Sequence, residues 1–563
     1  MPILKSISEQ VGAAIVRALS NALASGDLPS GMELPDQILL ERPKNRDHGD
    51  YTTPTALVLS KRSGVNPRSL AEIISRYLFA DPQINGSLAR IDIAGPGFLN
   101  ISVAKSVKGE IIAAIMREGE TYGHSSNLAG VTINLEFISA NPTGPLHLGH
   151  TRWAAVGDAL GRLLTAAGAK VTREFYINDR GNQMELFGAS LRAAAQGVPV
   201  PEDGYHGEYI NVLANEISDL HPEFVALPES ESLVAFRDAG YALQLDEQQR
   251  VLSGFRTIFD VWYSEKSLYE NAYFAHCLDR LITEGHVFEA DGATWLRTTD
   301  FGDDKNRVMI KSDGTFAYFA SDSAYYMSKR ERGFDICIYM LGADHHGYVN
   351  RLKAIAACAG DDPQYNIEIL IGQMVKIMEN GEELKLSKRA GTIITLEELV
   401  EKVGVDAARY TLIRYPVDTP MVMDVDVLRS RTNENPVYYV QYAHARIRGV
   451  LRNAEELGIS FGIDHIFPEL LDNECEQDLI GALAEFPRVV AGAAELREPH
   501  RIARYLEELA GIYHSFYAEC RVLPIGDESA TDLHRARATL CSATARVIAN
   551  SLTLLGVTAP EKM

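Results

Sequence analysis

The sequence has 563 residues, enough for three or four domains that each bury a core of their own. Hydrophobic residues make up 46% of it, as in ordinary globular proteins, and no apolar run approaches the roughly 20 residues of a membrane span, which excludes disordered and membrane-spanning classes. The formal net charge of −22 excludes a generically basic nucleic-acid binder, but it leaves room for local basic patches and aromatic platforms for single-stranded bases.

The cysteines and the first residues indicate the compartment. Six cysteines lie at positions 277, 337, 358, 475, 520 and 541, and no two of them form a Cys-x-x-Cys pair. This scatter argues against a structural zinc site or a disulfide framework and favours a reducing compartment. The opening residues, Met-Pro-Ile-Leu-Lys-Ser, lack the build of a signal peptide. The sequence therefore predicts a cytoplasmic protein without zinc.

Residues 1 to about 125 are predicted to form a separate α+β domain. Apolar residues recur at helical spacing in Val11–Leu23 and Ser69–Leu78. Two short strands, Ala89–Ile93 and Gly97–Val103, lie on either side of a Gly-Pro-Gly turn.

A second domain is predicted from about residue 126, and it opens with a strand, a turn and a helix. Val131–Ile138 alternates apolar and polar residues, as a β-strand does, and a helical apolar pattern runs from Trp153 to Gly168. The turn between them is Ser139-Ala-Asn-Pro-Thr-Gly-Pro-Leu-His-Leu-Gly-His150. Together they form the opening half of a βαβ unit, whose helix N-terminus presents N–H groups and a positive dipole end to an anion.

Two histidines stand at the start of that helix. His147 and His150 are three residues apart, so both rings can lie on one face beside the helix N-terminus. Gly149 leaves room for a flat ligand to approach the backbone. The arrangement suits a nucleoside triphosphate, although a bare His-x-x-His is more often an ordinary turn with two solvated histidines.

The rest of this domain repeats the strand and helix pattern. Near-continuous apolar strands are predicted at Lys170–Ile177, Phe334–Leu341 and Ile367–Ile377, with helices between them. Helical and loop-rich sequence from 181 to about 300, including Phe259–Glu265, reads as an insertion. The pattern predicts an α/β, Rossmann-like, doubly wound parallel sheet over residues 126–424, with ligands beyond the carboxyl ends of the strands.

A short basic loop follows the last of these strands. Within it Lys385 and Lys388 lie on either side of Ser387, so the loop could place two ammonium groups on phosphates as negative charge develops there. Taken alone, the same residues could form a solvated surface loop.

From about residue 425 to the end the sequence is helical throughout, which predicts an all-α domain over 425–563. Asn435-Pro436 is a typical helix start, an N-cap followed by Pro at the first helical position. The helix after it carries tyrosines and arginines, Tyr442 and Arg446 among them, that could stack on bases and contact phosphates. Much of this aromatic stripe must nevertheless pack in the core.

His147-Leu-Gly-His150 and Lys385-Leu-Ser-Lys-Arg389 resemble the two signature motifs of class I aminoacyl-tRNA synthetases, HIGH and KMSKS, in spelling, order and separation. The longer stretch Glu136–His150, with Tyr176-Ile-Asn-Asp179 and Gly181-Asn-Gln-Met184, is similar to arginyl-tRNA synthetases. The resemblance runs nearly end to end. The lysine loop departs from the commonest spelling, but both of its lysines are present.

The resemblance implies a reaction and a set of residues. ATP and L-arginine would form arginyl-adenylate, and the arginyl group would pass to the 3′-terminal adenosine of the tRNA for arginine, with Mg²⁺ neutralising the departing pyrophosphate. Catalytic positions would be His147, His150, Lys385 and Lys388, joined in ATP binding by Gly149 and Ser387. Matching positions of the arginine pocket are Glu136, Asn141, Tyr318, Asp322 and His346, with Asp344 as an alternative to His346 and a helix N-cap as another role for Asp322.

The resemblance also implies where tRNA binds. Phe98 and Asn100 of the N-terminal domain would meet the D-loop at the tRNA elbow, and strand packing is the alternative for both. Tyr442 and Arg446 would lie in an anticodon-binding domain, and a monomer is expected. Three other functions stay open: a class I synthetase for another amino acid, a nucleotidylyltransferase, and a non-catalytic tRNA-binding relative.

Overall fold

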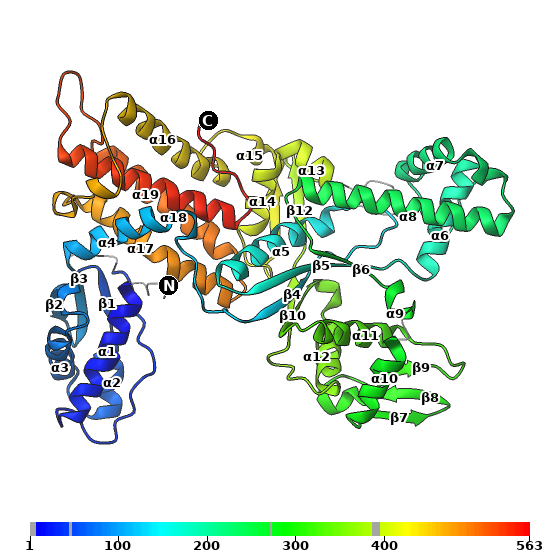
Figure 1. Cartoon of the computed structure of the whole chain (residues 1–563), viewed down its shortest axis with the longest axis horizontal. Helices are drawn as coiled ribbons and strands as arrows, with labels where there is room; N and C mark the ends of the chain where they lie inside the picture. Colours follow the sequence, from blue (N-terminus) through cyan, green and yellow to red (C-terminus); the bar gives the residue numbers. More distant parts are fainter. Residues whose placement is uncertain (1–6, 44, 46–47, 271–272, 385–393) are drawn as a thin grey trace.

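The computed structural model of the chain describes residues 7–43, 45, 48–270, 273–384 and 394–563 (Figure 1). The N-terminal domain and the C-terminal helices lie together at one end of an elongated molecule, and a parallel sheet lies in the middle. Helices α6 and α7 project from the far end of the long helix α8.

The N-terminal domain is a three-stranded antiparallel sheet with helices packed against it. The sheet has the order β1-β3-β2, and the fully buried side chains of Leu19, Ile74 and Ile101 belong to a core of its own. Asn66 starts α3, because its side chain accepts hydrogen bonds from two backbone N–H groups and Pro67 follows it. Its elements, with the helix α4 that leads out of it, are α1 (Ile7–Ala24), β1 (Tyr51–Thr53), α2 (Thr55–Ser63), α3 (Pro67–Ala80), β2 (Leu88–Ala94), β3 (Phe98–Val103) and α4 (Lys105–Glu118).

The central sheet is parallel and has the order β11-β10-β4-β5-β6. Counted in chain order from β4, the strands stand 5-4-1-2-3, so the order reverses between β4 and β10. The predicted doubly wound parallel sheet is therefore confirmed. The strands are β4 (Thr132–Glu136), β5 (Lys170–Ile177), β6 (Val261–Ser264), β10 (Ile336–Gly342) and β11 (Ile367–Gly372).

Helices cover both faces of this sheet, which explains why its strands are apolar on both sides. In β10, Ile336 and Ile338 belong to the core that includes α5, whereas Cys337 and Tyr339 belong to the core of α11 and α12. Helix α5 (Leu148–Ala166) covers one face, with α14 (Val405–Ile413) packed on α5, and α11 (Tyr318–Glu331) and α12 (Tyr348–Cys358) cover the other (Figure 1).

The sequence between 181 and 300 is not one insertion, contrary to the prediction. Val261–Ser264 returns to the central sheet as β6 and pairs in parallel with β5. Four residues are too few to show a period, and the strand is held by packing, with the ring of Trp262 stacked 4.5 Å from that of Phe175. The added elements are α6 (Asn182–Ala195), α7 (Glu208–Leu220) and α8 (Glu229–Gly254) before β6, then α9 (Lys266–Glu270), α10 (Tyr273–Thr283), β7 (Val287–Ala290), β8 (Ala293–Leu296) and β9 (Arg307–Ile310) after it.

The single strand predicted over 367–377 is two strands, and that prediction is wrong in this detail. After β11 the chain turns, and β12 joins a separate small sheet of order β13-β12-β14. A Cβ on Gly372 would lie 2.4 Å from the Trp153 ring, and the N–H of Gln373 turns away to the carbonyl of Val417, 2.8 Å distant. The strands of this sheet are β12 (Val375–Glu379), β13 (Glu382–Glu383) and β14 (Met421–Asp424).

The C-terminal part is helical, as predicted. Helix α16 begins at Pro436, but the Asn435 side chain does not cap it, because its Nδ2 donates to the carbonyls of Leu428 and Ser430. The remaining helices are α13 (Leu396–Val403), α15 (Val425–Arg429), α16 (Pro436–Glu456), α17 (Glu474–Glu495), α18 (His500–Glu519) and α19 (Asp532–Leu554). Across the described ranges, no helix has both the length and the apolarity to cross a membrane.

Candidate active site

The turn of residues 139–150, called here the HLGH turn, lies where the strand order of the central sheet reverses. It follows the carboxyl end of β4, and the segment Gly342–Gly347 follows the carboxyl end of β10, the strand beside it. Crevices at such reversal points are the usual ligand sites of open α/β sheets. The fold therefore brings the two segments to one candidate site.

The two histidines cap helix α5 reciprocally. His147 is the N-cap, and its Nδ1 accepts from the N–H of Gly149 at 3.1 Å. The N–H of His147 in turn donates to Nδ1 of His150 at 3.2 Å, and the two ring centroids lie 4.0 Å apart. A Cβ on Gly149 would lie 2.9 Å from Cε1 of the His147 ring, so a larger residue here would displace that ring. The pair forms one imidazole surface at the helix N-terminus.

Backbone strain marks the exit from β4. Ile138 and Ser139 have φ angles of 70° and 47°, in the left-handed region that a β-branched isoleucine seldom adopts. The Oγ of Ser139 donates to Oε1 of Glu136 at 3.0 Å and accepts from the N–H of Tyr176 at 3.2 Å. These bonds hold the turn against the end of β5.

Three predicted phosphate-binding residues, Lys385, Ser387 and Lys388, lie outside the described residues. The segment that follows them is fixed on the HLGH turn. The N–H of Leu148 donates to the carbonyl of Ile394 at 3.1 Å, and the N–H of Leu396 donates to the carbonyl of Leu146 at 2.8 Å. The chain therefore leaves the lysine loop beside the first motif.

Glu136 is buried and has a cationic partner that the sequence did not reveal. Lys329 of α11, also buried, places its Nζ 2.5 Å from Oε2 of Glu136. The same ammonium lies over the rings of Tyr325 and Tyr339, at 4.3 and 3.8 Å from their centroids. Because a buried carboxylate needs a cation or hydrogen bonds, Lys329 and Ser139 account for the burial of Glu136.

Asp322 and Glu265 form the acidic part of the site. Burial raises the pKa of Asp322 to about 7; Arg351 acts against this shift, and the charges of Glu265 and Glu136 add to it. Burial and the charge of Asp179 likewise raise the pKa of Glu265 to about 7. Burial and neighbouring negative charge thus disfavour the ionised forms of Asp322 and Glu265, and a bound cation would favour them, which makes this region a candidate site for a cation.

Asp322 lies in the second turn of α11, and the N-cap of that helix is Ala317. The alternative that Asp322 caps the helix is therefore wrong. Its half-buried carboxylate instead lies within electrostatic range of Glu136, as the pocket prediction requires.

The other predicted pocket residues lie nearer the surface. Tyr318 is 88% exposed, and His346 is exposed as well. Asn141 is exposed and donates to Oε1 of Gln183 at 2.6 Å. The side chain of Asp344 faces His345 at 3.6 Å. The structure thus places Glu136 within electrostatic range of Asp322, whereas the other predicted pocket residues are exposed.

Sequence reasoning missed Lys329, Glu265 and the acceptor role of Asp179. Asp179 accepts from Oγ of Ser264 at 2.5 Å and from the N–H of Lys266 at 3.1 Å. Asp179 belongs to a motif that carries the resemblance, and its position just after the carboxyl end of β5 could have indicated a role in the site. Lys329 gave no signal, because it lies in a basic helix end that resembles a solvated surface.

Comparisons with known proteins decide the family. Three family models match, described as arginyl tRNA synthetase N terminal domain over 8–103, tRNA synthetases class I (R), catalytic domain over 111–203 and 236–443, and DALR anticodon binding domain over 440–563. A relative named arginine–tRNA ligase from Paenarthrobacter aurescens (strain TC1) is 51% identical over 99% of this chain and 100% of its own length. The chain belongs to the arginyl-tRNA synthetases. The predicted family and the predicted enzyme class are thereby confirmed.

A second relative supports this assignment, and a solved structure shares the fold. The arginine–tRNA ligase of Frankia alni is 52% identical over 98% of this chain and 99% of its own length. The solved arginyl-tRNA synthetase of Thermus thermophilus shares the fold, with a TM-score of 0.75 at 21% identity over 99% of this chain and 100% of that one.

In the helical part matched by the anticodon-domain model, a group of aromatic and cationic side chains lies on α16 and α18. Nη2 of Arg446 donates to the hydroxyl of Tyr442 at 3.0 Å, and its guanidinium lies 4.9 Å from the ring centroids of Tyr442 and Tyr517. Tyr438 stacks on Tyr442 with centroids 5.9 Å apart. His444 of the same helix, by contrast, is 4% exposed, so its side chain is not available to RNA.

The two predicted elbow residues differ in exposure. Phe98 is 39% exposed at the start of β3, whereas Asn100 is 4% exposed. Oδ1 of Asn100 accepts from Oγ1 of Thr52 on the neighbouring strand at 2.9 Å. The burial of Asn100 favours strand packing for this residue.

Proposed function

We propose that this arginyl-tRNA synthetase activates L-arginine with ATP and transfers the arginyl group to the 3′-terminal adenosine of the tRNA for arginine. One observation carries the proposal: the histidine-capped helix N-terminus lies at the strand reversal, after the strand that ends at Glu136, and Glu136 is within electrostatic range of Asp322, a carboxyl group with a raised pKa. The first feature suits ATP and the second suits a guanidinium.

In the first step, a carboxylate oxygen of arginine attacks the α-phosphorus of ATP, and the bond from that phosphorus to pyrophosphate breaks. We assign His147, His150 and Gly149 to the α-phosphate and the nucleotide. Lys385, Lys388 and Mg²⁺ would neutralise the departing pyrophosphate, and Ser387 would bind the nucleotide beside them. Positioning and charge stabilisation supply most of the rate in such phosphoryl transfers.

In the pocket, we assign the guanidinium of arginine to Asp322 first, with Glu136, Asn141, Tyr318 and His346 around it. Glu136 already holds Lys329 at Oε2, whereas Asp322 has a raised pKa that a bound guanidinium would lower. Binding of the positively charged guanidinium is therefore favoured, because it relieves the repulsion among these carboxylates.

In the second step, a ribose hydroxyl of the 3′-terminal adenosine attacks the arginyl carbonyl carbon, loses its proton and displaces AMP. We assign residues 425–563, with Tyr442 and Arg446, to the anticodon, and residues 1–125, with Phe98, to the tRNA elbow. Asn100 would support Phe98 through the strand. The active form would be a cytoplasmic monomer, in keeping with the free cysteines.

The test is ATP–pyrophosphate exchange with each amino acid, with and without tRNA, followed by charging of tRNA. Exchange with arginine and arginylation of tRNA are the expected results. Exchange with another amino acid would keep the class and overturn the pocket. Absence of exchange from folded, tRNA-binding protein would favour a non-catalytic relative.

A further inference from the structure

Helix α14 joins segments that lie far apart in the sequence. Its Arg409 is fully buried, and Nη2 lies 2.6 Å from Oδ2 of Asp158. Asp158 belongs to α5, eight residues after His150. This buried ion pair ties α14 to the helix whose N-terminus carries the HLGH turn.

The same guanidinium also holds the end of the helical part. Its Nε and Nη2 donate to the carbonyl of Leu555, at 3.2 and 3.1 Å, and its Nη1 donates to the carbonyl of Phe255 at 2.9 Å. A Cβ on Gly556, whose φ is 67°, would lie 2.3 Å from Nη2. Only a planar fork can make these bonds at once, so lysine cannot replace arginine here.

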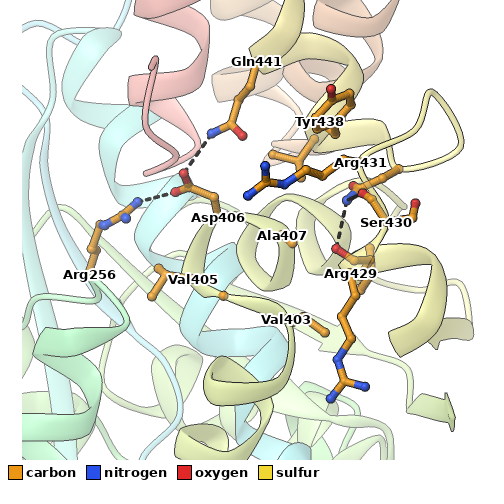
Figure 2. A pocket seen from close by; sticks show the side chains of 14 residues that line it. Arg256, Val403, Val405, Asp406, Ala407, Arg429, Ser430, Arg431, Tyr438 and Gln441 are labelled. Carbon is orange, nitrogen blue, oxygen red and sulfur yellow. Dashed lines mark hydrogen bonds and ion pairs between the residues drawn. The ribbon is translucent and has the colours of Figure 1, made fainter. Parts of the chain in front are cut away.

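One turn earlier on α14, Asp406 joins the same parts. It accepts from Nη1 of Arg256 at 2.5 Å, from Nε2 of Gln441 at 2.8 Å and from the N–H of Thr558 at 3.2 Å. Figure 2 shows Arg256 and Gln441 converging on Asp406 in the wall of a cavity of about 350 Å³. Gln441 immediately precedes Tyr442 on α16.

The last residues of the chain run back along α16. The carbonyl of Pro560 lies 2.9 Å from Nδ1 of His444, and Glu561 pairs with Arg448 at 2.6 Å. Residues 555–561, called here the C-terminal tail, thus contact α14 at one end and α16 at the other. Continuous contacts run from the helix of Tyr442 and Arg446 to the helix of the two histidines.

We propose that Arg409 is a positioning residue for aminoacylation. By holding Asp158 and the C-terminal tail in one geometry, it sets the HLGH turn against α16, so that tRNA bound on α16 raises turnover at the HLGH turn. A buried ion pair adds little net stability over an apolar replacement, and what its directed bonds add is a fixed arrangement. This inference rests on the proposed function, because that function places tRNA binding on α16 and catalysis at the HLGH turn.

The test compares Arg409→Lys with Arg537→Lys, a matched control. Arg537 also pairs with a buried carboxylate, that of Glu476 at 2.7 Å, but this pair joins α19 to α17 within the helical part. Charging is measured with a transcript of the tRNA for arginine and with the same transcript carrying an altered anticodon. Binding of tRNA is measured separately, and circular dichroism reports folding.

Arg409→Lys is expected to lower kcat on the cognate transcript by about 3- to 30-fold while tRNA affinity stays within about twofold. The ratio of kcat between the two transcripts should fall, because the anticodon no longer acts on the HLGH turn. Arg537→Lys should leave that ratio unchanged. Equal effects of the two variants, or a wild-type ratio in Arg409→Lys, would overturn the inference.

If Arg409→Lys does not fold, Asp406→Asn takes its place, because this substitution is isosteric at a half-buried position. Asp406→Asn should also lower the ratio of kcat between the two transcripts, and a wild-type ratio would overturn the inference. A wild-type chain that charges no tRNA with arginine overturns the proposed function and this inference together. Normal wild-type charging with unchanged ratios in the variants overturns this inference alone.

Discussion

Two groups of buried charge in this molecule are built in opposite ways. Burial raises the pKa values of Asp322 and Glu265 to about 7, and the negative charge of neighbouring carboxylates adds to both shifts. Around Arg409, by contrast, the buried Asp158 is paired with Arg409 at 2.6 Å and with Arg162 at 2.7 Å. The Arg409 guanidinium also donates to the carbonyl of Leu555. The carboxyl groups of the first group would be stabilised by a bound cation, whereas Arg409 and Asp158 are already paired within the protein.

This difference in charge pairing distinguishes a ligand-binding site from a cluster that holds structural elements together. A folded chain that keeps unbalanced carboxylates loses stability, so it keeps them where binding a cation gives that stability back. Paired charges such as Arg409 and Asp158 gain nothing from a ligand, and they fix an arrangement. Neutralising an acid in each group should therefore have opposite effects on stability and unequal effects on activity.

The largest effect is expected from Asp322→Asn. An arginine guanidinium that meets a neutral amide in a buried pocket loses about 3–5 kcal/mol, so kcat/KM for arginine should fall by roughly two to four orders of magnitude in ATP–pyrophosphate exchange. The KM for ATP should stay nearly constant. Asp279→Asn, at an exposed position of α10, is the matched control. An equal loss in both variants would contradict the pocket.

A smaller effect is expected from pH. Asp322 and Glu265 are ionised mainly above their pKa of about 7, so arginine should bind better at pH 8 than at pH 6. At pH 6 about one tenth of each carboxyl is ionised, which predicts a fall of roughly tenfold in kcat/KM for arginine. Glu265→Gln removes a negative charge that raises the pKa of Asp322, so it should shift this profile to lower pH. A profile that is flat in the wild type would contradict the assignment.

The sequence predicted the fold and the first motif well, because both depend on local patterns. The hydrophobic periods of strands and helices can be recognised from residues that are neighbours in the sequence. The same holds for the spacing of His147 and His150. The partner of Glu136 is not, since Lys329 lies 193 residues away and reaches it only when α11 packs on the sheet. Strand β6 was not predicted for a related reason. Its four residues form a strand because they pair with β5, and this pairing is not visible as a hydrophobic period in the sequence.

The smallest effect, and the sharpest contrast between the two groups, is expected in thermal stability. Glu265 has a pKa of about 7 in the folded protein and an ordinary value near 4.5 when unfolded, so between these values the folded state binds more protons. The free energy of unfolding contributed by this group therefore falls as pH rises through that window. Glu265→Gln removes this penalty and should raise Tm at pH 8 by about 2–4 °C.

Asp406 gives the opposite expectation. Burial acts to raise its pKa, but hydrogen bonds from Thr558 and Arg256 outweigh burial and hold the pKa below its ordinary value. Its contribution to stability is present above that ordinary value and is lost as pH falls through the lowered one. Asp406→Asn should therefore lower Tm at pH 8, where Glu265→Gln raises it. Differential scanning calorimetry of both variants tests the contrast, and shifts of the same sign would show that the two groups are not built in opposite ways.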